Sequence, residues 1–136
     1  MSVVKRCRAF SSYVDQVAHA RAWLDVTLGD IGPVPEAARA AAVLLLSEAV
    51  TNAILHTQTR TITVRVEVAP GRVRVETEDE GAPHSTPTVV AAPADAEHGR
   101  GLRIMSAFAE EWGPLNRRPG VYYVVAFAPE GAAAVT

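Results

Sequence analysis

Three short groups of polar residues have types and spacings that could do chemistry. The first is Glu48, Asn52 and His56, which stand four residues apart and therefore line one side of a helix. Glu48 is the only ionisable side chain in residues 40–55, which indicates a mostly covered helix. A carboxylate and an amide on a covered helix need partners, and a metal ion with a bound polyanion would supply them. The competing interpretation is an ordinary solvated helix face.

The second group is Asp79-Glu80-Gly81, where a predicted strand enters a loop. A carboxylate at a strand end can accept a hydrogen bond from an exocyclic amine. A glycine two residues later lets a flat ring approach the backbone. Alone, the same residues could also form an ordinary acidic turn.

The third group is Gly99-Arg100-Gly101-Leu102, a glycine-flanked start of a predicted helix. Unsatisfied backbone N–H groups and the helix dipole make such a start suitable for an anion. Arg100 would add a charge-assisted hydrogen bond to a phosphate. A flexible hinge before a helix is the competing interpretation.

The hydrophobic periodicity predicts the elements that must position these groups. In chain order we expect a strand over 3–10, helices over 13–28 and 36–56, a hairpin of 61–68 with 73–75, a long loop over 80–98, a helix from Leu102 to about Trp112, a short strand near Leu115 and a strand over 121–128. This order predicts an α+β fold: a two-layer α/β sandwich whose mixed, mostly antiparallel sheet is covered by helices on one face. We expect residues 1–129 to form the domain and residues 130–136 a flexible C-terminal tail.

Composition excludes several classes of function. The chain has 136 residues, 49% of them hydrophobic, and 13 basic residues against 15 acidic ones. This charge balance argues against direct nucleic-acid binding. The single cysteine, Cys7, excludes an internal disulfide, and the single lysine, Lys5, excludes a Walker-type phosphate loop. We find no leader and no apolar stretch that reaches the length of about 18 residues of a membrane helix, and so expect a cytoplasmic protein without membrane contact.

Taken together, the three groups resemble the Bergerat ATP-binding fold, shared by gyrase, heat-shock chaperone, histidine-kinase and MutL-type ATPases. The resemblance covers about residues 8–128. The chain has no room for a phosphoacceptor hairpin or a transducer domain. The runs Leu46-Ser47-Glu48-Ala49-Val50-Thr51-Asn52-Ala53 and Gly99-Arg100-Gly101-Leu102, with the ending Trp112-Gly113, look like the stand-alone anti-sigma-factor serine kinases.

The resemblance implies a role for each site residue. Glu48 would orient or deprotonate the attacking hydroxyl, and Asn52 would coordinate Mg²⁺. Asp79 would accept the adenine amine, with Gly81 beneath the ring. The phosphates of ATP would be held by the helix start, and residues 82–98 would form the ATP lid. The helix-start residues that bind the nucleotide would be Gly99, Arg100, Gly101 and Leu102.

One residue departs from the family pattern. Relatives often place a small hydroxyl residue after the glycine of the last hairpin, where it supports the aspartate through water. Here Gly120 is followed by Val121 and Tyr122, and Tyr122 stands near that position. The tyrosine could fill the space or face away.

The resemblance implies an ATP- and Mg²⁺-dependent serine kinase that is also an anti-sigma factor. Its partners would be a sigma factor and an anti-anti-sigma protein whose serine it phosphorylates, and a homodimer is expected on the same basis. A second hypothesis is a nucleotide-responsive binding module with little kinase activity, which would control its partner by contact. A third is an adaptor that binds no nucleotide.

Overall fold

The computed structural model describes residues 3–81 and 103–129 of the chain. The elements, in order, are β1 (Val4–Ser11), α1 (Gln16–Ile31), α2 (Glu36–His56), β2 (Thr61–Ala69), β3 (Arg72–Glu78), β4 (Glu111–Pro114) and β5 (Gly120–Ala126). A short helical segment over residues 103–108 precedes β4. The expected lid, the glycine-flanked helix start and the C-terminal tail lie outside the described residues.

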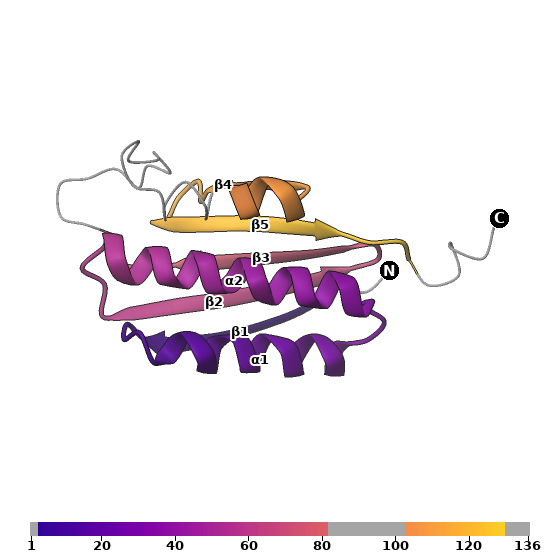
Figure 1. Ribbon diagram of the computed structural model, residues 1–136, viewed down its shortest axis with the longest axis horizontal. Coiled ribbons are helices and arrows are strands. Elements are labelled where there is room, and N and C mark those ends of the chain that lie inside the picture. Colours follow the sequence, from indigo (N-terminus) through magenta and orange to yellow (C-terminus); the bar gives the residue numbers. More distant parts are fainter. Residues whose placement is uncertain (1–2, 82–102, 130–136) are drawn as a thin grey trace.

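The five strands form one sheet in the order β1-β2-β3-β5-β4, with α1 and α2 on one face (Figure 1). Each neighbouring pair in this sheet is antiparallel. The α+β two-layer architecture is confirmed. The sheet expected to be mixed is antiparallel throughout the described strands. Hairpins account for the pairs β2–β3 and β4–β5, which are joined by short connections.

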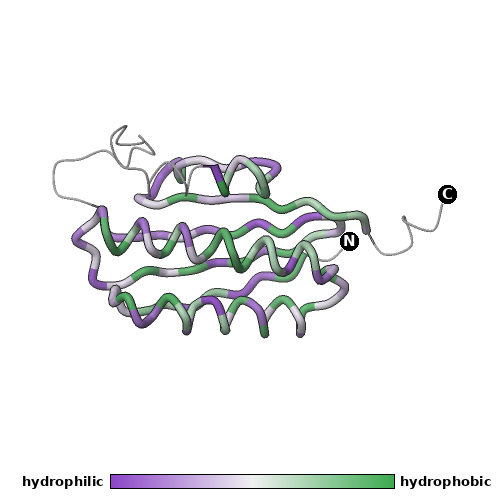
Figure 2. Tube along the Cα trace, in the orientation of Figure 1, coloured by the Kyte–Doolittle hydropathy of each residue, from purple (hydrophilic) through white to green (hydrophobic). Residues whose placement is uncertain are grey.

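The hydrophobic core lies between the helices and the covered face of the sheet. β2 and β3 alternate along their length, so one face of each strand is buried and the other is polar. The buried strand residues are Ile62, Val64, Val66, Val68, Val73 and Val75. They meet the buried side of α2, which includes Leu45, Leu46 and Val50. In Figure 2 hydrophobic (green) and hydrophilic (purple) residues are interspersed along the helices and along β2 and β3.

The boundaries of α2 agree with the prediction, but the segment before the last strand does not. A helix to Trp112 and a strand near Leu115 were expected. The helical segment instead covers residues 103–108, and β4 already begins at Glu111. Trp112 pairs with Tyr123 of β5, so the segment forms a strand of the sheet instead of continuing the helix. Trp112 packs against the core from this strand.

α2 is long and apolar enough, by length and composition alone, to cross a membrane. Its most apolar window has a mean hydropathy of 1.4 and at most two charged residues, whereas the sequence was expected to contain no such stretch. Its buried side packs against the sheet and α1. α2 is therefore the core helix of this domain.

Candidate functional site

Four of the predicted site residues lie within the described part of the chain: Glu48, Asn52, Asp79 and Gly81. The other four, Gly99, Arg100, Gly101 and Leu102, lie outside it. The structure therefore describes where the expected catalytic, metal-binding and adenine-binding residues lie. The expected phosphate-binding turn stays a prediction.

An ion pair shows which side of α2 faces α1. Arg39 forms an ion pair with Asp25 of α1, with Nε and Oδ1 3.1 Å apart. Nine residues, or about two and a half helical turns, separate Arg39 from Glu48, so Glu48 lies on the opposite side of the helix. Asn52 lies one turn further along that side. Both residues therefore lie on the flank of α2 that faces away from α1.

The side chains on this flank have no protein partner in the described structure. Glu48 and Asn52 are each partly buried. Within residues 3–81 and 103–129, neither side chain makes a hydrogen bond or an ion pair. A half-buried carboxylate and amide in this state can bind a ligand. The third residue of the predicted group, His56, is exposed at the end of the helix.

The same flank lies at the end of the sheet that carries Asp79. The Tyr123 hydroxyl of β5 donates a hydrogen bond of 2.6 Å to the Ala42 carbonyl of α2, and Val75 of β3 stands opposite Tyr123. From this common level α2 and β3 run toward the same end of the molecule (Figure 1). Asn52 lies about 15 Å further along the helix and Asp79 about 13 Å further along the strand direction. The two residues are therefore at nearly the same level.

Asp79 is held in a tight turn just after β3. Its N–H donates to the carbonyl of Pro119 at 3.0 Å, and its Oδ1 accepts the Gly81 N–H at 2.7 Å. Burial raises the pKa of the Asp79 carboxyl. The Gly81 hydrogen bond opposes this rise, and the charges of Glu78 and Glu80 add to it. A partly desolvated carboxylate whose second oxygen has no described protein donor is suited to accept a ligand N–H.

Gly81 is required by the geometry of this turn. Its φ is 73°, in the left-handed region that side chains rarely adopt. A Cβ added there would lie 3.3 Å from the Cβ of Pro119. The turn itself therefore accounts for the glycine, and the approach of a flat ring to Gly81 stays a prediction.

Glu80 supports the turn in a way that the sequence did not predict. Its Oε1 accepts hydrogen bonds from the Thr59 hydroxyl at 3.2 Å, from the Arg60 N–H, and from the Thr61 N–H at 3.1 Å. Its own N–H donates to the Thr59 hydroxyl at 3.0 Å. The Arg60 and Thr61 hydrogen bonds lower the pKa of Glu80. Glu80 thereby ties the end of β3 to the start of β2, beside Asp79.

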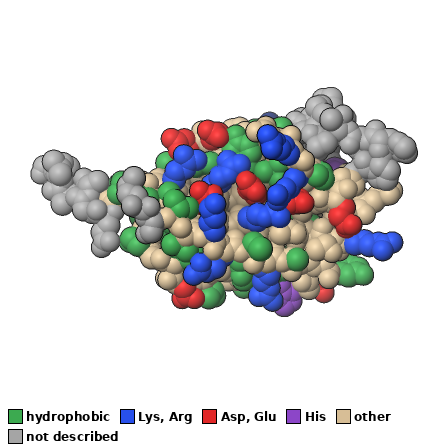
Figure 3. All heavy atoms as spheres, turned by 180° about the vertical axis from the view of Figure 1, so that it is seen from behind, with side chains coloured by type: hydrophobic (Ala, Val, Ile, Leu, Met, Phe, Trp, Pro, Cys, Tyr) green, Lys and Arg blue, Asp and Glu red, His purple; other side chains and the backbone are tan. Residues whose placement is uncertain are grey.

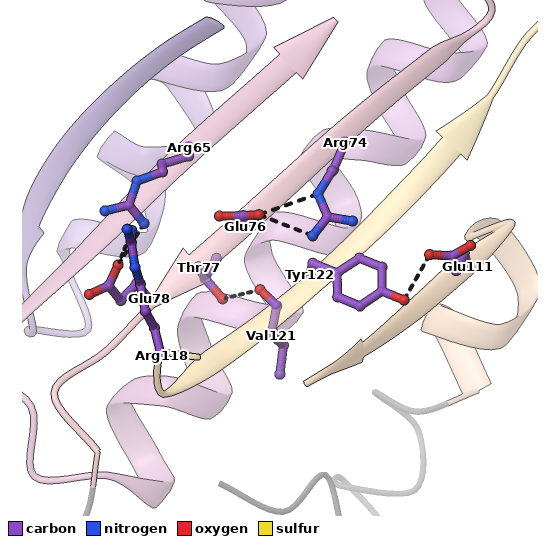
Figure 4. A network of polar contacts seen from close by, with 9 residues as sticks. All are labelled: Arg65, Arg74, Glu76, Thr77, Glu78, Glu111, Arg118, Val121 and Tyr122. Atoms are coloured by element: carbon purple, nitrogen blue, oxygen red, sulfur yellow. Dashed lines mark hydrogen bonds and ion pairs between the residues drawn. The ribbon is translucent and has the colours of Figure 1, made fainter. Parts of the chain in front are cut away.

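Thr77 is a second residue that the sequence analysis missed. It is a polar residue on the covered face of β3, 2% exposed, two positions before Asp79. Its hydroxyl donates only a long hydrogen bond of 3.5 Å to the Val121 carbonyl (Figure 4). Gly120 packs closely against it, because a Cβ at Gly120 would lie 2.0 Å from the Thr77 carbonyl oxygen. The sequence does contain a signal for Thr77, because a polar residue stands there at a position where the alternation of β3 predicts an apolar one.

Tyr122 faces away from this site. Its ring lies on the open face of the sheet, with the Arg74 guanidinium 4.2 Å from the ring centroid. Its hydroxyl donates to Glu111 at 2.8 Å (Figure 4). Val121 takes the covered side instead, directly opposite Thr77. Tyr122 therefore does not lie beside Asp79, and Thr77 supplies a hydroxyl on that side.

A model of the histidine kinase-like ATPase domain matches residues 10–120. The chain belongs to this family. A comparison with curated proteins found no match. The antiparallel sheet with its helices on one face is consistent with the fold of this ATPase superfamily, and membership supports ATP as the ligand. The matched range contains all eight predicted site residues, including the four that the structure does not describe.

The described residues of this ATPase domain fit ATP as a ligand. Asp79 offers a carboxylate acceptor at the end of a strand, and Glu48 and Asn52 offer oxygen atoms on the neighbouring flank of α2. Within the described ranges no cluster of three or more His, Cys, Asp or Glu side chains could hold a metal ion. The assignment of Mg²⁺ to Asn52 stays a prediction.

Proposed function

We propose that this ATPase domain is a protein serine/threonine kinase that also acts as an anti-sigma factor. It would bind a sigma factor and phosphorylate a serine of an anti-anti-sigma partner, thereby regulating transcription in the cytoplasm. Membership of the histidine kinase-like ATPase family supports ATP use. The sequence around Glu48, Asn52 and the turn at residues 99–102 supports the narrower assignment by resemblance.

The observation that carries this proposal is the position of Glu48 and Asn52. Both are half-buried, both lack a described protein partner, and both lie on the flank of α2 at the end of the sheet that carries Asp79. A solvated helix face would not need this arrangement. Phosphoryl transfer does, because it depends mainly on positioning groups around the phosphates.

Each residue has a defined part in the proposed reaction. Asp79 accepts a hydrogen bond from the exocyclic amine of adenine and so places the base. Asn52 would provide an amide oxygen for Mg²⁺, which would neutralise charge on the phosphates of ATP. Glu48 orients the partner's serine hydroxyl. The residues from Gly99 to Leu102 would hold the phosphates.

The proposed transfer needs only ATP and the serine of the partner as reactants. The serine oxygen forms a bond to the γ-phosphorus while the bond between that phosphorus and the ADP oxygen breaks. The hydroxyl proton passes to the Glu48 carboxylate, directly or through water. ADP leaves with the bonding electron pair, and the partner carries a phosphoserine.

Replacing Glu48 with alanine tests the kinase assignment. We expect Glu48→Ala to reduce transfer of labelled phosphate to the partner's serine by at least about a hundredfold. ATP binding, measured by calorimetry with and without Mg²⁺, should stay close to wild type. Glu36→Ala removes the only other acidic residue of α2, at the far end of the helix, and is the matched control.

The outcomes separate the competing functions. Transfer that is undiminished in Glu48→Ala would contradict the role of Glu48. ATP binding without transfer in the wild type would instead support a nucleotide-responsive binding module. The orientation of Tyr122 removes the main argument for that alternative. No ATP binding at all would support an adaptor. The homodimer stays a proposal that sedimentation would test.

A further inference from the structure

The free edge of the sheet at β1 is cationic. Lys5, Arg6 and Arg8 are all exposed, and the strand contains no acidic residue. Within the described residues none of the three forms an ion pair with a carboxylate, although Glu67 stands opposite Lys5 in β2. Arg6 donates to the carbonyl of Lys5 at 2.9 Å, and Arg8 lies over the ring of Phe10. Within residues 3–81 and 103–129, β1 therefore carries three basic side chains that no carboxylate binds.

The two edges of the sheet differ in their capacity to accept another strand. β1 is eight residues long and, among the described strands, pairs only with β2. An edge of this length presents a row of backbone N–H and C=O groups to a partner. The opposite edge, β4, has four residues and ends in Pro114, which lacks a donor. β1 is thus the edge suited to strand addition.

A hollow adjoins β1 on the open face of the sheet. It has a volume of about 420 Å³ and is lined by Lys5, Arg6 and Cys7 together with charged residues of β2 and β3. Figure 3 shows this face, with blue and red side chains gathered near its centre. The arginines on its far side, Arg65 and Arg74, already bind Glu78 and Glu76 (Figure 4). Among the basic residues that line the hollow, those without a described carboxylate partner are therefore on β1.

We propose that β1 binds an extended acidic segment of a partner protein, which adds to the sheet as a further strand. Successive side chains of β1 point to opposite faces, so Lys5 lies on the open face and Arg6 and Arg8 on the other. Acidic side chains on either face of the added strand therefore meet a cation. Opposite charges across neighbouring strands stabilise the pair, and the backbone hydrogen bonds fix its register.

A second copy of this chain is the wrong occupant for the edge. Pairing β1 with β1 would bring the basic side chains of both copies together, and like charges on adjacent strands are destabilising. The inference concerns binding at β1 and does not depend on nucleotide binding or on kinase activity.

Fluorescence anisotropy with the full chain would test the proposal. The probe is a labelled eight-residue peptide of alternating glutamate and threonine, at low ionic strength. We expect saturable binding that the double change Arg6→Glu and Arg8→Glu weakens by about tenfold. The control is Arg72→Glu with Arg117→Glu, which changes the net charge equally at exposed positions away from the edge. It should bind within about twofold of wild type.

Three results would overturn the proposal: no saturable binding to the wild type, an equal loss in the control, or equal binding of a peptide with proline at alternate positions. The last two would indicate general charge attraction, and the first a charged edge that only prevents pairing. Thermal unfolding shows that each variant is folded. If the double glutamate variant is not, Arg6→Gln with Arg8→Gln takes its place, with an expected loss of about threefold.

Discussion

The polar residues on the two faces of the sheet differ in the partners that they have. On the open face two arginines of β2 and β3 form ion pairs: Arg65 lies 2.6 Å from Glu78, and Arg74 lies 3.0 Å from Glu76. The covered face is apolar along β2 and β3 until Thr77, and beyond it comes the half-buried Asp79. There the polar groups lack strong partners from other elements.

This difference distinguishes polar residues that are paired with one another from polar residues that could bind a ligand. Partly exposed ion pairs contribute little to stability and need nothing further. A desolvated hydroxyl or carboxylate without a good protein partner lowers stability unless a ligand completes it. Counting charged residues would point to the open face. Asking which polar groups are buried and unpaired points to the end of β3 and the neighbouring flank of α2.

The sharpest test of this comparison uses two adjacent carboxylates that lie on different faces. We expect Asp79→Asn to weaken ATP binding by about tenfold or more, because the charged acceptor is lost. Glu78→Gln changes the next residue, which pairs with Arg65 and Arg118 on the open face, and should leave ATP affinity within about twofold. Calorimetry measures both. Equal losses would show that the two faces do not differ in this way.

A smaller effect is expected from the buried hydroxyl of Thr77. Thr77→Val keeps the shape of the side chain and removes the hydroxyl, so we expect ATP affinity to fall about threefold to tenfold. Stability should change little, since the only hydrogen bond described for that hydroxyl is 3.5 Å long. Thr63→Val on the open face of β2 is the control. Unchanged ATP affinity in Thr77→Val would remove Thr77 from the site.

The sequence predicted those features that depend on local pattern. The bounds of α2 follow from Pro35 and the apolar periodicity, and the alternation of β2 gives its buried face. Asp79 and Gly81 are recognisable because a carboxylate and a glycine follow a strand. Each of these signals is contained within about twenty residues of chain.

The features it missed depend on contacts between distant segments. Glu80 binds the backbone of Arg60 and Thr61, twenty residues earlier, and nothing in the spacing indicates that pairing. β4 forms because Trp112 and its neighbours pair with β5, although Trp112 also fits a helical period. The direction of the Tyr122 side chain could have been predicted from the sequence, because alternation along a strand places it on the face opposite to the buried Tyr123.

The two adjacent tyrosines of β5 lie on opposite faces of the sheet and should contribute differently to the free energy of unfolding. Tyr123 is fully buried, and burial raises the pKa of its hydroxyl well above the usual value. Tyr123→Phe removes its hydrogen bond to Ala42 and should cost about 1 kcal/mol in the free energy of unfolding. Tyr122→Phe, on the open face, should cost less. Denaturant unfolding measures both, and a larger loss in Tyr122→Phe would contradict the assignment of faces.

The smallest expected effect is a pH dependence of opposite sign at Asp79 and Glu80. Hydrogen bonds lower the pKa of Glu80 in the folded state, so its stabilisation is present above the unfolded-state pKa. It is lost as the pH falls through the folded-state pKa. Wild type should therefore lose its stability advantage over Glu80→Gln on acidification. Burial raises the pKa of Asp79, so the folded state favours the protonated carboxyl there.

Wild type should accordingly gain stability relative to Asp79→Asn as the pH falls through the range between the folded-state and unfolded-state pKa values of Asp79. Urea unfolding of the three proteins from neutral to acidic pH measures both differences. Two differences that change with pH in the same direction would contradict the contrast between an exposed carboxylate held by backbone donors and a desolvated one. Opposite slopes would show that Glu80 fixes the turn by its charge while its neighbour Asp79 is held in a desolvated position. A desolvated carboxylate beside a ligand site is suited to accept a hydrogen bond from that ligand.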